Sequence, residues 1–180
     1  MDHGTILLAI ARSTIANELG VHAPMPARDD ALRKPGASFV SLSIDGKLRG
    51  CIGTLRAYRD LGDDVAENAI AAAFQDPRFG PLQRSELDQI RIEVSELTEP
   101  KAIGYDGTRA GAIAALRPGV DGVVLHAGRH RATFLPQVWQ SLPDPNQFLS
   151  HLLAKAGLDP NTWPADTTLE RYGVSSWQEP

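Results

Sequence analysis

The chain has 180 residues, a length that fits one domain or two small subdomains sharing a core. Hydrophobic residues make up 42% of it and charged residues 22%, which is enough apolar material for a folded core and excludes global disorder. With 18 Lys and Arg against 22 Asp and Glu, the formal net charge is -4, which gives no overall attraction to a nucleic-acid backbone.

The cellular setting is predicted from the cysteine count and from the start of the chain. The single cysteine allows neither an intramolecular disulfide nor a cysteine-rich zinc module, and this favours a reducing compartment. An acid, Asp2, stands where a signal peptide carries basic residues, and the first apolar run ends at Arg12. No stretch approaches the length that crosses a bilayer. We therefore expect a cytoplasmic protein without nucleic-acid or membrane partners.

Periodicity and turn signals predict a helix, a β-hairpin and a second helix in the first half of the chain. In chain order these are a helix over 6–19, strands over 38–44 and 47–55, and a helix from Asp60 or Asp63 to Phe74. Gly20 is placed to end the first helix, because glycine adopts the left-handed cap conformation without strain. Asp45 and Gly46 form the turn dipeptide of the hairpin. Asp76 precedes a proline and ends the second helix.

The second half of the chain predicts further hairpins and short helices. In chain order these are a strand over 90–95, a helix over 108–116, strands over 120–126 and 131–135, a helix over 145–156 and an extended segment over 169–177. Asp144 is an N-cap followed by proline at the first helical position. Hairpins mixed with helices, without regular β-α-β alternation, predict an α+β fold with a mainly antiparallel sheet flanked by helices.

Residues 48–54, which read Leu-Arg-Gly-Cys-Ile-Gly-Thr, are the most unusual segment of the sequence, because they hold two glycines, an arginine and the single cysteine within a predicted strand. Two glycines in a strand are costly, so we expect positive φ or a close backbone approach at Gly50 and Gly53. If the strand alternates without a bulge, Arg49 and Cys51 share a face, and a cation beside the thiol favours the thiolate. The residue type alone favours another interpretation, in which Cys51 is a small core residue and the glycines relieve crowding.

These residues and three later strings closely resemble the AMMECR family, whose bacterial and archaeal members are called AmmeMemoRadiSam system protein A. The matching strings are residues 48–54, 76–79, 134–138 and 155–158. The likeness runs from the first helix to Glu179. Gly80 departs from it, since the family usually carries proline there.

The resemblance implies an α+β fold of two subdomains, with the 48–54 motif near a cleft between them. The larger subdomain would be built from the N- and C-terminal parts of the chain, and the smaller one would be inserted. The resemblance also implies association with a Memo-like protein and a radical S-adenosylmethionine protein. It implies no established reaction.

We expect a functional cleft around the motif. The candidate catalytic residue is Cys51, and the candidate ligand-binding residues are Arg49, Gly50, Gly53, Arg78, Glu93 and Lys155. Arg78 is a fork suited to carboxylate or phosphate, although a surface ion pair explains it equally well. Glu93 lies on the polar face of its strand. It could serve as a base, although such a residue is more often simply solvated. Lys155 matches the family strings, but its place also suits a helix C-terminus. No metal site or cofactor is predicted.

Two functions are consistent with this sequence. The first is an enzyme component that acts on a small anionic substrate in a pathway with the Memo-like and radical S-adenosylmethionine proteins. The alternative is a non-catalytic adaptor or ligand-binding module for a partner protein. A reactive thiol with a nearby base would favour chemistry, whereas an inert buried Cys51 would favour binding.

Overall fold

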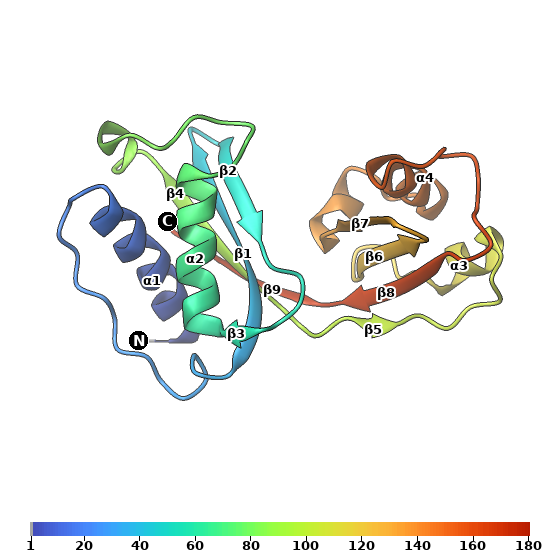
Figure 1. Cartoon of the computed structure of the whole chain (residues 1–180), viewed down its shortest axis with the longest axis horizontal. Helices are drawn as coiled ribbons and strands as arrows, with labels where there is room; N and C mark the ends of the chain where they lie inside the picture. Colours follow the sequence, from blue (N-terminus) through green and yellow to red (C-terminus); the bar gives the residue numbers. More distant parts are fainter. Residues whose placement is uncertain (1) are drawn as a thin grey trace. The chain divides into compact units, whose positions relative to one another are not determined.

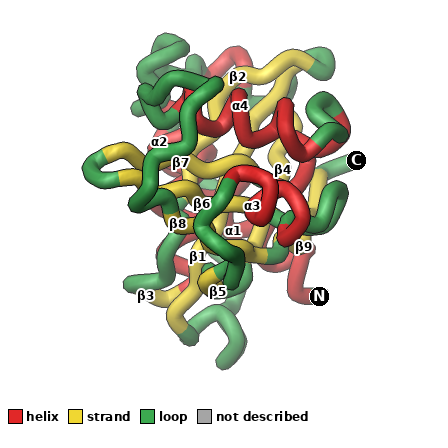
Figure 2. The backbone as a smooth tube through the Cα atoms, turned by 90° about the vertical axis from the view of Figure 1, so that its right-hand side faces the viewer, coloured by secondary structure: helices red, strands yellow, loops and turns green. Residues whose placement is uncertain are grey.

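The computed structural model describes residues 2–180 and shows an α+β fold, which confirms the predicted fold class (Figure 1, Figure 2). The helices within this range are α1 (His3–Glu18), α2 (Leu61–Phe74), α3 (Arg109–Ala115) and α4 (Pro145–Lys155), with short 3-10 helices η1 (Arg84–Glu86) and η2 (Pro136–Gln140). The strands are β1 (Pro35–Ile44), β2 (Lys47–Gly53), β3 (Arg59–Asp60), β4 (Arg91–Leu97), β5 (Lys101–Ala102), β6 (Gly122–Ala127), β7 (His130–Phe134), β8 (Thr168–Tyr172) and β9 (Val174–Gln178). None of the described helices has both the length and the apolar character that spanning a membrane requires.

The chain divides into two compact units. The first runs up to Thr98 and includes Ser175–Pro180, and the second is Glu99–Val174. Each has its own sheet and its own hydrophobic core. The cleft that the family resemblance implies between two subdomains stays a prediction.

The first unit is a sheet covered on one face by two helices. Its strands lie in the order β2-β1-β4-β9, and β3 pairs with the start of β1. Alternate residues of the central strands, such as Val40 and Ile92, are fully buried in one core with α1 and α2. The helix side also holds a polar contact, because the buried carboxylate of Asp64 in α2 accepts hydrogen bonds from the backbone and hydroxyl of Ser38. Figure 1 shows α1 and α2 side by side against this sheet.

The predicted first hairpin is present, but it contains a bulge. Leu42 is the register partner of Gly50, whereas Ser43 is the partner of Leu48, so Arg49 has no partner on β1. An extra residue of this kind breaks the simple alternation of faces along a strand. Arg49 and Cys51 were expected to share a face only if the strand had no bulge, and this condition is not met.

Close approach, and not positive φ, explains the two motif glycines. Neither is among the positive-φ glycines of the chain. A Cβ at Gly50 would lie 2.0 Å from the carbonyl oxygen of Ala72 in α2, and a Cβ at Gly53 would lie 2.2 Å from the ring of Phe39. Gly50 thus admits the helix backbone on one face of β2, and Gly53 admits an aromatic ring on the other.

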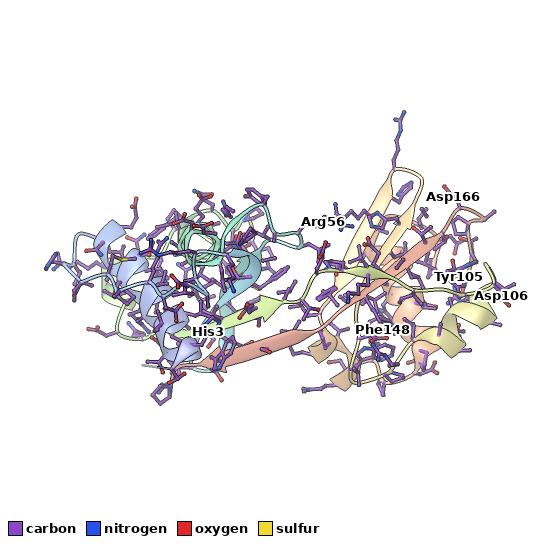
Figure 3. The ribbon with its side chains drawn as sticks, turned by 90° about the horizontal axis from the view of Figure 1, so that it is seen from below. His3, Arg56, Tyr105, Asp106, Phe148 and Asp166 are labelled. Carbon is purple, nitrogen blue, oxygen red and sulfur yellow. The ribbon has the colours of Figure 1, made fainter. Side chains whose placement is uncertain are left out.

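The second unit has a four-stranded sheet, β5-β8-β6-β7, and a core that includes residues of α4. Phe148 of α4 is fully buried and stacks on Trp139, with ring centroids 3.8 Å apart. The Trp139 indole donates its N–H to the carbonyl oxygen of Asp121 at 2.7 Å, which satisfies its polar group inside the core. Figure 3 shows Phe148 among the side chains of this unit.

Replacing Gly50 by alanine tests the close approach of α2. The new methyl group would meet the backbone of Ala72, which cannot swing aside, so we expect a loss of roughly 1–3 kcal/mol in the free energy of unfolding. Gly80→Ala is the matched control, because nothing lies within 4 Å of its Cβ position, and it should stay within about 0.5 kcal/mol of the wild type. Urea unfolding measures both. Equal midpoints for the two variants would contradict the packing argument.

Candidate functional site

The motif strand β2 lies at a border of its sheet, and its outer side is partly closed by side chains. In an antiparallel pair, every second residue turns its N–H and C=O away from the neighbouring strand. At Cys51 the N–H donates to Asp76 Oδ2 at 3.0 Å, and the carbonyl oxygen accepts from Arg78 Nη2 at 3.3 Å. Asp76 and Arg78 therefore occupy the place that another strand would take, which blocks pairing at this point of the edge.

The Asp76 carboxylate is buried and fully engaged. Its side chain is 2% exposed, and it accepts from Arg78 Nη2 at 2.7 Å and from Arg78 Nε and the Arg78 backbone N–H at 3.0 Å. The hydrogen bond from the Arg78 side chain holds the pKa of Asp76 well below its usual value, with help from the two backbone N–H groups and against the effect of burial. The same contact raises the pKa of Arg78.

Arg49 forms a second ion pair beside this one. Its Nε and Nη2 bond to the Glu86 carboxylate at 2.8 and 3.1 Å, and Nη1 donates to the carbonyl oxygen of Gly80 at 3.0 Å. The hydrogen bond with Arg49 lowers the pKa of Glu86, whose carboxylate also accepts from the Gln83 N–H at 2.7 Å. The charge of Arg49 is thus directed to η1, and Arg49 ties β2 to the segment after α2.

Phe79 lies within cation–π distance of both arginines. The guanidinium carbons of Arg78 and Arg49 are 5.5 and 6.0 Å from the centre of its ring. Asp76, Arg78 and Phe79 of the 76–79 string therefore serve one arrangement around β2, and they hold the strand through both backbone and side-chain contacts.

Cys51 lies on the sheet face opposite the helices, in a row of polar side chains. Ser41 is its register partner on β1, and Glu93 is the partner of Ser41 on β4. The Ser41 hydroxyl donates to Cys51 Sγ at 3.0 Å. The thiol is partly exposed and lies outside the hydrophobic core of its unit, which does not agree with the core interpretation. The three residues place a thiol, a hydroxyl and a carboxylate in line across three strands.

The predicted site residues do not all belong to one unit. Lys155 ends α4 in the second unit, where its ammonium donates to the Thr133 carbonyl oxygen at 2.8 Å and lies 5.1 Å from the centre of the Phe134 ring. The other candidates are residues of the first unit. No group of three His, Cys, Asp or Glu side chains within residues 2–180 is placed to hold a metal ion.

Sequence reasoning missed Ser41 and Glu86. A regular hairpin through a two-residue turn would place Ser41 opposite Gly50, and only the bulge brings it opposite Cys51. No local sequence pattern points to Glu86, because its partner Arg49 lies 37 residues earlier in the chain. Asp76 was visible in the 76–79 string, although its contact with the Cys51 backbone was not.

Comparison with known proteins gives consistent matches over nearly the whole chain. The family described as AMMECR1 matches residues 8–177. A protein of Methanothermobacter thermautotrophicus is 36% identical, with 99% of this chain and 95% of that protein covered. A protein of Sulfurisphaera tokodaii is 38% identical, with 89% and 74% covered. The crystal structure of the uncharacterised protein PH0010 from Pyrococcus horikoshii is similar with a TM-score of 0.87 and 30% identity, over 98% of this chain and 91% of that one.

Replacing Asp76 by asparagine removes the buried charge that closes the β2 edge. Because the pKa of Asp76 is lower in the folded than in the unfolded chain, its stabilising contribution is complete above about pH 4 and is lost as the pH falls further. We expect Asp76→Asn to lower the free energy of unfolding at neutral pH by roughly 2–3 kcal/mol, at the lower end for a buried pair because Arg78 is half exposed. Urea unfolding over a range of acid pH should also show a flatter acid decline than the wild type.

The exposed Asp88 provides the control for this pH experiment. Asp88→Asn should match the wild type at neutral pH and keep its acid decline, since surface substitutions usually change stability by less than about 0.5 kcal/mol. An Asp76→Asn profile parallel to the wild-type profile would contradict a stabilising role for the buried carboxylate.

Proposed function

The chain belongs to the AMMECR1 family, and on that premise we propose that it binds a small anionic ligand, a carboxylate or a phosphate, beside Cys51. Arg78 is the cation that meets the ligand. One observation carries the proposal, which is that the Arg78 guanidinium is anchored through Nε and Nη2 and has Nη1 available.

Arg78 combines a fixed orientation with exposure. Its Nε and Nη2 are held by Asp76 and by the Cys51 carbonyl oxygen, whereas Nη1 donates to no group among residues 2–180. The side chain is nevertheless 54% exposed. An arginine that is already oriented loses little conformational entropy when it binds an anion, and its Nη1 N–H groups can donate to a carboxylate or phosphate oxygen. Since Asp76 balances its charge, recognition depends on directed N–H groups more than on net charge.

The thiol is close enough to the same guanidinium to interact with it electrostatically. The Cys51 sulfur is one of the smaller causes that raise the pKa of Arg78, after the hydrogen bond and charge of Asp76. The hydroxyl of Ser41 donates a hydrogen bond to this sulfur at 3.0 Å. We propose that an anion held by Arg78 lies within reach of the thiol, and that Ser41 and Glu93 support a reaction there.

Family resemblance supplies the proposed context. The anionic ligand would be a substrate or product in a pathway with a Memo-like protein and a radical S-adenosylmethionine protein. An adaptor role is the second candidate, and one observation favours it: Leu48, the first residue of the motif, is 47% exposed and would suit a partner surface. In that case the pathway proteins would be the bound partners.

Arg78→Lys tests the anion site while it retains a positive charge opposite Asp76. A hydrogen bond to a charged group contributes about 1.5–3 kcal/mol, so we expect the affinity for the anion to fall by roughly tenfold or more. Native mass spectrometry of protein purified from its own host would identify a retained anion and compare its occupancy between variants. Arg33→Ala, which changes an exposed arginine outside the site, should keep wild-type occupancy. Equal occupancy in Arg78→Lys, or retention of a neutral molecule only, would rule out this site.

Cys51→Ser distinguishes thiol chemistry from binding. The change nearly preserves the shape of the side chain, so we expect a folded protein that no longer supports the pathway in cells. Alkylation of the wild-type thiol should proceed in the folded protein, and Ser41→Ala should slow it by removing the hydroxyl that donates to the sulfur. A thiol that reacts only after unfolding, together with full activity of Cys51→Ser, would favour the adaptor.

A further inference from the structure

The β2 edge has a second outward peptide position, two residues beyond the one that Asp76 and Arg78 close. The N–H of Thr54 donates inward to the Ser38 carbonyl oxygen at 2.8 Å. Strand alternation therefore directs the N–H and C=O of Gly53 outward, as at Cys51. No group among residues 2–180 bonds to these Gly53 atoms.

Gly53 lies in the wall of a groove of about 550 Å³, within the size range of small-molecule sites. Thr54 continues this wall, Tyr58 comes from the loop before β3, and Glu67 and Gln75 come from α2 or its end. Because glycine has no side chain, Gly53 contributes only backbone atoms to the lining. Figure 1 shows the chain passing from β2 through this loop to β3 beside α2.

The two charged residues that line the groove, Arg59 and Glu67, form an ion pair. Arg59 donates from Nε to the buried carboxylate of Asp64 at 2.9 Å and from Nη1 to Glu67. The Asp64 carboxylate is in turn held by Ser38 and Asn68, so this wall is a bonded network of fixed geometry. Because the buried Asp64 does not line the groove, the lining carries one cation and one anion that pair with each other, and the groove suits a neutral ligand.

Tyr58 provides an exposed aromatic surface at the groove. It is 69% exposed, and the guanidinium carbon of Arg59 lies 4.7 Å from the centre of its ring. Arg59 is fixed by its acids, so it helps to orient the ring. An aromatic face of this kind is a stacking platform for a planar ligand.

An added peptide strand fits this edge poorly. Asp76 and Arg78 already take the hydrogen-bonding groups of Cys51, and the chain bends directly after Thr54. Between Cys51 and this bend only Gly53 could pair with such a strand, whereas strand addition draws its affinity from a series of main-chain bonds. A compact ligand needs only the single donor and acceptor that Gly53 offers.

We propose that this groove binds a planar, neutral amino-heterocycle of the nucleobase kind. A ring nitrogen of the ligand accepts from the Gly53 N–H, its exocyclic amino group donates to the Gly53 carbonyl oxygen, and its face stacks on Tyr58. The site is distinct from the anion position at Arg78 and does not depend on it.

Titration with adenosine, a neutral probe, tests the groove. We expect a saturable shift of the Gly53 amide signal in ¹⁵N NMR spectra, and a loss of affinity for N6,N6-dimethyladenosine, which lacks the amino donor. Tyr58→Ala should weaken binding by roughly 5- to 100-fold, the effect of removing one stacked aromatic ring. Tyr58→Phe, the matched control, should bind like the wild type, and so should Arg78→Lys.

Each result decides the proposal. Absence of a Gly53 shift at millimolar adenosine overturns it, and so does equal affinity of Tyr58→Ala and the wild type. If N6,N6-dimethyladenosine binds as tightly as adenosine, the amino group does not donate to the Gly53 carbonyl oxygen, and the proposed ligand class is overturned. If Arg78→Lys loses the retained anion but binds adenosine like the wild type, the groove is a site independent of Arg78. The same result supports the anion proposal, which fails separately if Arg78→Lys keeps the anion.

Discussion

The carboxylate of Asp76 is the interaction on which the candidate site depends. It is almost excluded from solvent, and it accepts hydrogen bonds from the Cys51 N–H and from the Arg78 guanidinium. A buried carboxylate is tolerated only where its charge is paired and its oxygens are bonded. One side chain therefore fixes the outer edge of β2 and the orientation of Arg78. Its contact with Cys51, 25 residues earlier in the chain, joins the 76–79 string to the 48–54 motif.

Closing the edge at Cys51 but not at Gly53 divides β2 into two chemical environments. Around Cys51 the groups are a thiol, a hydroxyl and a fixed guanidinium, which suit a charged ligand. Around Gly53 the available groups are peptide N–H and C=O, and the adjacent Arg59 is paired with Glu67 in the groove lining. The same strand alternation that directs both peptides outward thus separates a charged position from a neutral one within a few ångströms.

Folding requirements explain most of the 48–54 motif. Gly50 admits the backbone of α2, Gly53 admits the ring of Phe39, and Arg49 ties β2 to η1 through Glu86. Cys51 has no such requirement, because it is partly exposed and outside the core. Its sulfur and the unused Nη1 of Arg78 are the features of this region that packing does not explain, and they are the ones on which the proposed function rests.

The sequence by itself determined the local elements, the α+β class and the family, because caps such as Asp144, turn dipeptides and hydrophobic periods act over a few residues. Only the tertiary structure decided what surrounds the cysteine. The bulge at Arg49 shifts the hairpin register by one residue, with Gly50 packed against the backbone of α2. The pairing of Arg49 with Glu86 spans 37 residues, and the Asp76 contact spans 25. Contacts of that range leave no periodic signal in the sequence, because they depend on how distant segments pack and not on local conformation.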